Sequence, residues 1–201
     1  MSRAMSATPL APVPVLPRPV RWSVAEFHRL VSEPWLEGRR MILVEGEILD
    51  MPHPNPPHDT SVGLTEDVLR RVFGPGHWVR GQMALVLGQS TDPLPDVAVV
   101  AGTPRDFPAH PRTALLVVEV AESSLAYDSG DKAHLYAAGG IEDYWVVDLV
   151  HRVLLMHRAP RPNSGAPFGW QFASVTTHHA ASVVSPLAAP QASLRVEDLM
   201  P

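Results

Sequence analysis

Two carboxylates interrupt apolar segments of the chain and are the residues best suited to chemistry. Asp96 follows Pro95 and precedes an apolar run at residues 97–100, and Glu119 stands inside the sequence LLVVEVA. A carboxylate in a buried strand is costly unless it is paired, hydrogen-bonded or bound to a metal, and neither strand offers an obvious internal partner. Carboxylate oxygens suit Mg²⁺ or Mn²⁺, and such a metal polarises a phosphate and lowers the pKa of a bound water. Asp96 and Glu119 therefore predict a metal site for phosphodiester hydrolysis; the alternative leaves each acid at a strand end, in solvent or capping a turn.

Other reactive side chains form no comparable group. His58 follows a proline-rich loop, where it can touch a phosphate or a metal or simply cap a helix. His178 and His179 have no third ligand at useful spacing, which disfavours a metal site there. Ser123 and Ser124 lack the flanking glycines of a nucleophile elbow. No phosphate-binding P-loop or dinucleotide fingerprint occurs in the sequence.

Periodicity and turn residues predict the elements that position these acids. A capping box of the form S-x-x-E at Ser23 and Glu26 starts the first helix, and glycines follow the other two. The helices are expected at residues 24–32, from Asp59 or Thr60 to Phe73, and from Asp128 or Ser129 to Gly139. The strands and hairpins are expected at residues 41–51, 78–87, 97–100, 115–121, 144–147 and 153–157, with peripheral elements at residues 170–176 and 194–200. This order predicts an α+β (mixed α/β) fold with a curved mixed sheet flanked by helices.

Composition limits the class of protein. The chain has 201 residues, of which 45% are hydrophobic, so we expect one domain at residues 21–201. Residues 1–20 contain five prolines and are expected to form a flexible leader. No apolar run approaches the roughly 18 residues of a membrane span. The absence of cysteine excludes disulfides and thiolate zinc sites and fits a cytoplasmic location. The formal net charge of -5 argues against broad, non-specific affinity for DNA.

Several segments together resemble the Uma-type restriction endonuclease family of the PD-(D/E)xK nuclease superfamily. They are LVEGEILDM, PNPPH, LPDVAVV and LLVVEVAESSLAYDSGDKAHLYAAGGIEDYWVVD. The likeness runs from Trp22 to Arg158 and weakly to Leu199, and its most specific part is the block from Glu119 to Asp148. The resemblance implies a restriction-endonuclease-like core, Mg²⁺ or Mn²⁺ as cofactor, nucleic acid (DNA above RNA) as substrate and a homodimer.

The family pattern also assigns roles to individual residues. Asp96 matches the aspartate of the PD motif and Glu119 the second acid, so the resemblance makes both of them metal ligands. The superfamily's lysine stands two residues after the second acid, where this chain has Ala121. The Uma-type pattern places a lysine on the following helix, which Lys132 matches. The alternative is that Lys132 is a solvated lysine that pairs with Asp128 or Asp131.

An acidic motif near the N-terminus matches Glu45 and Glu47, which the resemblance places at the rim of the site in an assisting role. The chain departs from the family pattern at residues 121–124, which read AESS, and at Asp59.

Two functions are compatible with these residues. One is a metal-dependent endonuclease, which the presence of Asp96, Glu119 and Lys132 favours. The other is a non-catalytic module that keeps the fold for binding nucleic acid or protein, which the acidic net charge and the altered loop favour.

Overall fold

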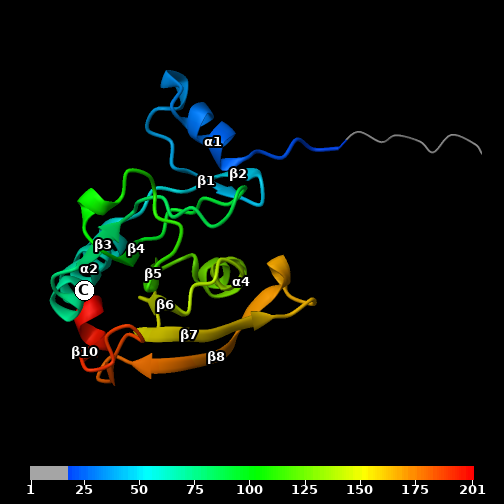
Figure 1. Ribbon diagram of the computed structural model, residues 1–201. Coiled ribbons are helices and arrows are strands. Elements are labelled where there is room, and N and C mark those ends of the chain that lie inside the picture. Colours follow the sequence, from blue (N-terminus) through cyan, green and yellow to red (C-terminus); the bar gives the residue numbers. More distant parts are fainter. Residues whose placement is uncertain (1–17) are drawn as a thin grey trace, which may run out of the picture.

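A six-stranded mixed sheet occupies the centre of the structure, a computed structural model that describes residues 18–201 (Figure 1). Its strands, in spatial order, are β3 (His77–Gly81), β4 (Val97–Ala101), β5 (Leu116–Ala121), β6 (Asp143–Asp148), β7 (Val153–Pro162) and β8 (Trp170–His179). Strands β5 and β6 run parallel, and all other neighbours in this sheet are antiparallel. The predicted mixed sheet is thereby confirmed. Residues 1–17 of the expected leader lie outside the described part of the chain.

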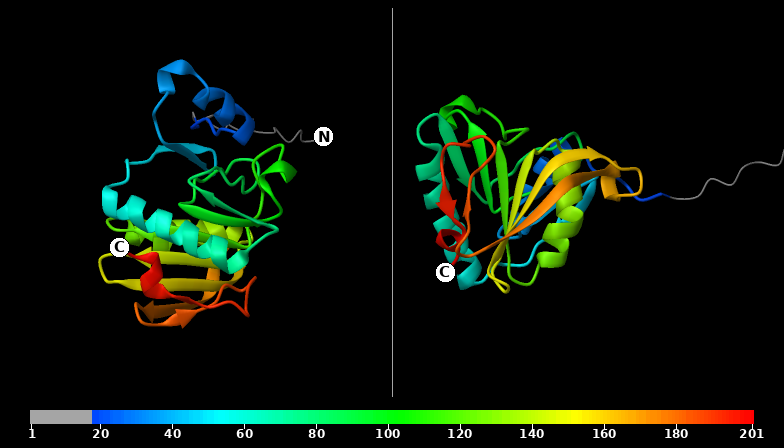
Figure 2. Two further views of the ribbon diagram at one scale, coloured as in Figure 1. Left: turned by 90° about the vertical axis from the view of Figure 1, so that its left-hand side faces the viewer. Right: turned by 90° about the horizontal axis from the view of Figure 1, so that it is seen from below.

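Helices cover both faces of the sheet (Figure 2). Helix α2 (Pro56–Phe73) packs on one face, together with the short C-terminal 3-10 helix Val196–Leu199. The helical segment from α3 (Leu125–Tyr127) to α4 (Ala133–Ala138) packs on the other. Residues of β5 alternate between the two cores, as a strand buried on both faces requires. The two helical layers therefore pack against opposite faces of β5, the strand that carries Glu119.

Antiparallel pairing of β4 with β5 brings the two strand acids together. Val97 lies opposite Val118, so Asp96, one residue before β4, lies beside Glu119. Side chains alternate along a strand, and Ala98 of β4 and Val117 of β5 both face the α4 side. The same alternation places Asp96 and Glu119 toward this side as well. The register of two strands thus decides the geometry of the pair.

The N-terminal part forms a separate small layer at one end of the sheet (Figure 1). Helix α1 (Val24–Val31) has the predicted capping box of Ser23 and Glu26 and packs on the hairpin β1 (Met41–Val44) and β2 (Glu47–Asp50). The 3-10 helix Pro34–Leu36 connects α1 to this hairpin. Gly46, in the hairpin turn, has a φ of 79°, and a Cβ atom there would lie 2.9 Å from the Cβ of Arg21. The hairpin turn therefore requires glycine.

Two helices begin earlier than the sequence predicted, and both differences change the site. Helix α2 begins at Pro56, because Asn55 caps it and proline is well tolerated in the first turn, where the missing N–H has no helical partner. Helix α3 begins at Leu125 and continues through a π-helical turn, Asp128–Lys132, into α4. The helix starts predicted at Asp59 or Thr60 and at Asp128 or Ser129 were therefore wrong. The earlier start places His58 on a helix.

Strand lengths also differ from the prediction. The strand expected at residues 78–87 ends at Gly81, because Gln82 adopts a φ of 50° and leaves the ladder. Strands β7 and β8 are longer than expected and pair from Val153 to Pro162. The two-residue strands β9 (Val183–Val184) and β10 (Leu194–Arg195) pair with each other. None of the helices described in residues 18–201 is long and apolar enough to span a membrane.

Buried His157 makes the stability of this fold sensitive to acid. Its ring packs 5.4 Å from that of Tyr144 and 5.7 Å from that of Phe172, and its Nε2 has no hydrogen-bond partner in the part of the chain that the structure describes. Burial, with the nearby His134, lowers the pKa of His157 from 6.5 to about 4. Between pH 6.5 and 4, His157 is protonated in the unfolded chain but neutral in the folded protein. The free energy of unfolding is therefore highest above pH 6.5 and decreases as the pH falls toward 4. The loss reaches about 3 kcal/mol.

We expect His157→Phe to remove this part of the acid sensitivity. The free energy of unfolding, measured with denaturant at pH 7, 5 and 4, should fall less in the variant than in the wild type. His179→Phe, at an exposed position of β8, is the matched control and should follow the wild type. Parallel pH curves for His157→Phe and the wild type would contradict the assignment.

Candidate active site

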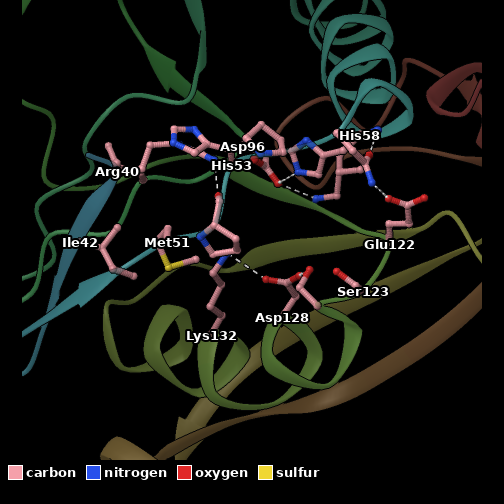
Figure 3. Close-up of a pocket in the computed structure, with 16 residues that line it drawn as sticks. Arg40, Ile42, Met51, His53, His58, Asp96, Glu122, Ser123, Asp128 and Lys132 are labelled. Carbon is pink, nitrogen blue, oxygen red and sulfur yellow. Dashed lines mark hydrogen bonds and ion pairs between the residues drawn. The ribbon is translucent and has the colours of Figure 1, made fainter. Parts of the chain in front are cut away.

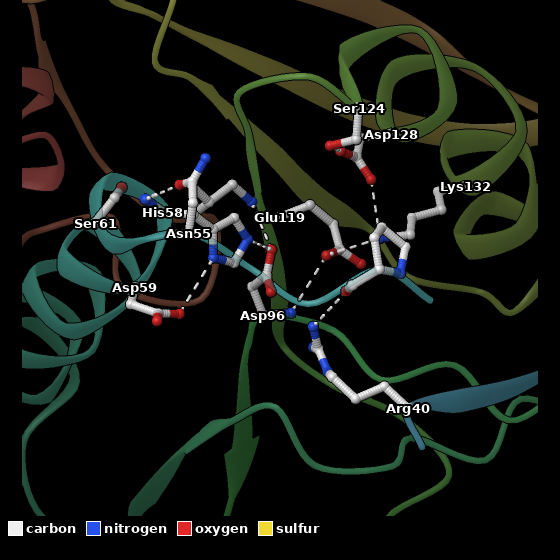
Figure 4. A network of polar contacts seen from close by, with 12 residues as sticks. Arg40, Asn55, His58, Asp59, Ser61, Asp96, Glu119, Ser124, Asp128 and Lys132 are labelled. Carbon is white, nitrogen blue, oxygen red and sulfur yellow. Dashed lines mark hydrogen bonds and ion pairs between the residues drawn. The ribbon is translucent and has the colours of Figure 1, made fainter. Parts of the chain in front are cut away.

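Asp96 is held at the start of β4 by contacts from two other elements. Its Oδ2 accepts a hydrogen bond from the backbone N–H of Val120 at 2.9 Å, and the Nε2 of His58 lies 3.1 Å away (Figure 4). Burial alone would raise the pKa of Asp96, but His58 and the positive charge of Lys132 outweigh it and lower the pKa. His58 changes in the opposite sense, because Asp96 raises its pKa despite burial. Asp96 is therefore a buried but ionised carboxylate.

Glu119 lies almost entirely out of solvent, with 1% of its surface exposed. Its Oε1 accepts a hydrogen bond from the Tyr136 hydroxyl at 2.6 Å, and its Oε2 accepts one from the backbone N–H of Asp96 at 3.3 Å. Burial raises the pKa of Glu119 to about 8, although the ammonium of Lys132 opposes this shift. A positive charge at the site therefore determines whether Glu119 is ionised.

Lys132 lies at the centre of a buried charge network. Its Nζ is 3.0 Å from Oε2 of Glu119 and 2.9 Å from Oδ1 of Asp128. Asp128 in turn accepts a hydrogen bond from the Ser124 hydroxyl. Burial lowers the pKa of Lys132, but the two carboxylates outweigh it and raise the pKa above its usual value. The pairing with Asp128 that the sequence left open thus occurs together with the contact to Glu119.

The π-helical turn explains how both Asp128 and Lys132 reach the site. Such a turn widens the helix locally, and single π turns are frequent at functional sites. Asp128 and Lys132 lie at its two ends and are 1% and 8% exposed. Tyr136, four residues after Lys132, contacts the same Glu119 from α4. The two side chains that hydrogen-bond to or pair with Glu119 in the described structure, Lys132 and Tyr136, therefore lie on one face of this helical segment.

A cavity of about 140 Å³ lies beside this network (Figure 3), and Glu119 and Tyr136 are not among the residues that line it. Asp96, Asp128 and Lys132 line it together with His58 and Arg40. The network also contains groups that sequence reasoning missed or weighed lightly: Arg40, Asn55, Asp128 and Tyr136. Asp128 and Tyr136 lie four residues before and after Lys132, and this helical spacing is the signal that could have found them. Arg40 and Asn55 belong to distant segments and carry no such local signal.

The structure does not bring Glu45 and Glu47 to this cavity. Glu47 pairs with Arg21 at 2.7 Å, and Glu45 accepts a hydrogen bond from the Thr91 hydroxyl. Both line a separate hollow together with Tyr127. The direction of the β1–β2 hairpin explains this placement. The start of β1, at Arg40 and Ile42, lines the Asp96 cavity, whereas the turn that carries Glu45 lies at the opposite end of the hairpin. Their predicted role at the rim of the site has no supporting contact here.

The donor set is compatible with a hard divalent cation. Among residues 18–201 no three His, Asp or Glu side chains are arranged as a ready-made metal cage. Mg²⁺, however, is commonly bound by one or two carboxylates together with waters and substrate phosphate. Asp96 and Glu119 supply two carboxylates from adjacent strands. Both oxygens of Glu119 accept hydrogen bonds, whereas of the two Asp96 oxygens only Oδ2 has a hydrogen-bond partner in the described structure. These two residues are therefore the ones that would hold such an ion.

Comparison with known proteins agrees with the fold and the motifs. A putative nuclease of DUF820 from Anabaena variabilis, solved by crystallography, superimposes with a TM-score of 0.65 at 17% identity, covering 90% of this chain and 97% of that one. At this identity the likeness concerns the fold. The type IIG restriction endonuclease BpuSI aligns over 56% of this chain and 12% of its own, with a TM-score of 0.33 and 13% identity.

No curated protein matches the chain. Residues 24–197 match the family Uma2, described as a putative restriction endonuclease. That match covers most of the chain and confirms the resemblance that its motifs carry. The chain belongs to the Uma2 family.

Proposed function

We propose that this protein is a Mg²⁺-dependent, or Mn²⁺-dependent, endonuclease that hydrolyses phosphodiester bonds of nucleic acid, with DNA as its substrate. The observation that carries the proposal is the convergence of Asp96, Glu119 and Lys132, from three different elements, in one buried cluster beside a cavity that Asp96 and Lys132 line. Burying three charges together is unfavourable for folding, which points to a functional reason for the arrangement. The family description and the fold support the same reaction class.

Each residue has a role that its position suggests. Asp96 and Glu119 would hold the metal, which when bound polarises the phosphate and lowers the pKa of a water. Lys132 presents a fixed positive charge beside the carboxylates, where negative charge grows in the transition state. His58, which is hydrogen-bonded to Asp96, fixes the orientation of that carboxylate. Tyr136 holds the other side of the site by its hydrogen bond to Glu119.

A second function is favoured by the same network. Glu119 already has Lys132 and Tyr136 as partners, so its charge is compensated within the protein. A non-catalytic module that binds nucleic acid or protein would need no more than this. The net charge of -5 is also low for a general DNA-binding surface.

Cleavage of defined substrates separates the two functions. The full-length protein is incubated with supercoiled plasmid, single-stranded DNA and RNA, each with Mg²⁺, Mn²⁺ or EDTA. We expect nicking or linearisation of DNA with either metal and none in EDTA, and titration calorimetry should detect Mn²⁺ binding. Absence of cleavage on all substrates, with retained binding of any of them, would favour the non-catalytic module.

We also propose a homodimer, because cleavage of both strands of a duplex is commonly performed by a symmetric pair of subunits. Light scattering should then give twice the chain mass of 21.9 kDa. A mass of one chain at assay concentration would contradict the dimer and leave the cleavage proposal intact.

A further inference from the structure

A second and larger cavity lies between α1 and the segment that follows β4. Its volume is about 870 Å³. Its walls include two arginines, two histidines and two aromatic side chains: Arg80, Arg112, His28, His110, Trp78 and Phe107. Among residues 18–201 no acidic side chain lines it, although the buried Asp92 pairs with His28 at 2.6 Å. In a protein with a net charge of -5, this cavity is a local concentration of basic and aromatic groups.

Arg80 is the most informative side chain of this cavity. Only 2% of the residue is exposed, and its Nη2 donates one hydrogen bond to the carbonyl of Ala84 at 3.1 Å. Its Nε and Nη1 have no partner in the described structure. Leaving donors of a charged group buried and unsatisfied is costly. Such a guanidinium is suited to a ligand that supplies acceptor atoms, such as a phosphate or a base edge.

Aromatic surfaces lie next to this guanidinium. The carbon of the Arg80 guanidinium is 4.6 Å from the centre of the Trp78 ring, and the Trp78 and Phe107 rings are 5.7 Å apart. Both rings are only partly buried. Flat apolar walls beside a cationic donor recognise a flat, acceptor-rich group, and a nucleobase is such a group.

A third hollow connects this cavity to the Asp96 site. It shares His28, Met83 and His110 with the second cavity. It shares Arg40 and Leu94 with the Asp96 cavity. Two arginines and two histidines line this connecting hollow, with one acid, Asp92, which pairs with His28 at 2.6 Å. The basic side chains outnumber the acid, and we name this path the basic track. A nucleic-acid backbone requires such positive charge along its course.

We propose that the Trp78–Phe107 cavity binds an unpaired nucleobase of the strand whose backbone follows the basic track to Asp96. This inference rests on the proposed function only for the identity of the ligand, nucleic acid. The base stacks on Phe107 and Trp78, and Arg80 donates to its edge or to the adjacent phosphate. A base inside a duplex has no exposed face, so the cavity selects single-stranded or locally opened substrate.

Binding of a labelled oligonucleotide without metal tests the cavity independently of cleavage. The probe is a fluorescein-labelled oligothymidylate of about twelve nucleotides, within the site sizes known for single strands, and anisotropy is measured in EDTA. We expect Phe107→Ala and Arg80→Met each to weaken binding by about fivefold or more. The same strand annealed to its complement should bind more weakly than the single strand to the wild type.

Matched controls remove a phenyl ring or a charge elsewhere. Phe168→Ala removes a half-buried phenyl ring from another hollow, and Arg71→Ala removes an exposed arginine of α2; both should bind as the wild type does. Arg80 is buried, so Arg80→Met can destabilise the fold. If Arg80→Met is unstable, Phe107→Ala, which lies in a connecting segment, tests the base site.

Unchanged affinity in Phe107→Ala, or an equal loss in Phe168→Ala, would overturn the proposed base site. Loss of binding in Phe107→Ala combined with no cleavage by the wild type would instead support the cavity and reject the nuclease function. The two proposals therefore fail separately.

Discussion

Replacing Asp96 with asparagine is expected to lower the rate of metal-dependent cleavage by at least about a hundredfold. The change removes one negative charge from the pair that would hold the metal and leaves the side chain's size unaltered. The asparagine oxygen can still accept from the backbone of Val120, so the start of β4 should stay in place. Calorimetry should show Mn²⁺ affinity reduced, and circular dichroism should show the fold unchanged.

Glu47→Gln is the matched comparison for this variant. It removes one carboxylate charge in the same way, but Glu47 pairs with Arg21 outside the cavity. We expect near wild-type cleavage. A loss equal to that of Asp96→Asn would support the rim role that the family pattern assigns to Glu47. Full activity in Asp96→Asn would reject Asp96 as a metal ligand.

Replacing Lys132 with methionine is expected to reduce both activity and stability. Cleavage should fall by about a hundredfold or more, because no other ammonium lies beside Glu119 in the described structure. Stability should fall by about 3 kcal/mol, since Glu119 and Asp128 would remain buried without their counter-charge. Denaturant unfolding and plasmid nicking measure the two effects separately.

A double variant separates the structural role of Lys132 from its role in cleavage. Glu119→Gln together with Lys132→Met removes the uncompensated charge of Glu119 and leaves only that of Asp128, so part of the lost stability should return. Cleavage should remain absent. Return of activity together with stability would mean that neither Glu119 nor Lys132 is needed for cleavage and that Lys132 serves the fold alone.

Local sequence patterns determined the elements and most of the chemistry. The capping box of Ser23 and Glu26, the glycines after the second and third helices and the apolar runs around Asp96 and Glu119 are short-range signals, and the corresponding elements are present. A carboxylate within a buried strand is energetically unfavourable unless it has a partner, so both carboxylates could be singled out without a structure. Lys132 could be identified because the family pattern fixes its distance from Glu119.

Tertiary structure alone decided which of these groups meet. The register of β4 and β5 places Asp96 beside Glu119, and register depends on packing across the whole sheet. The π-helical turn that brings in Asp128 differs from an α-helix by a small local rearrangement that propensity does not encode. The direction of the β1–β2 hairpin carries Glu45 away from the cavity and Arg40 toward it. Sequence thus supplies the charged groups, and long-range packing decides which of them share a buried site, because that choice depends on contacts between residues far apart in the chain.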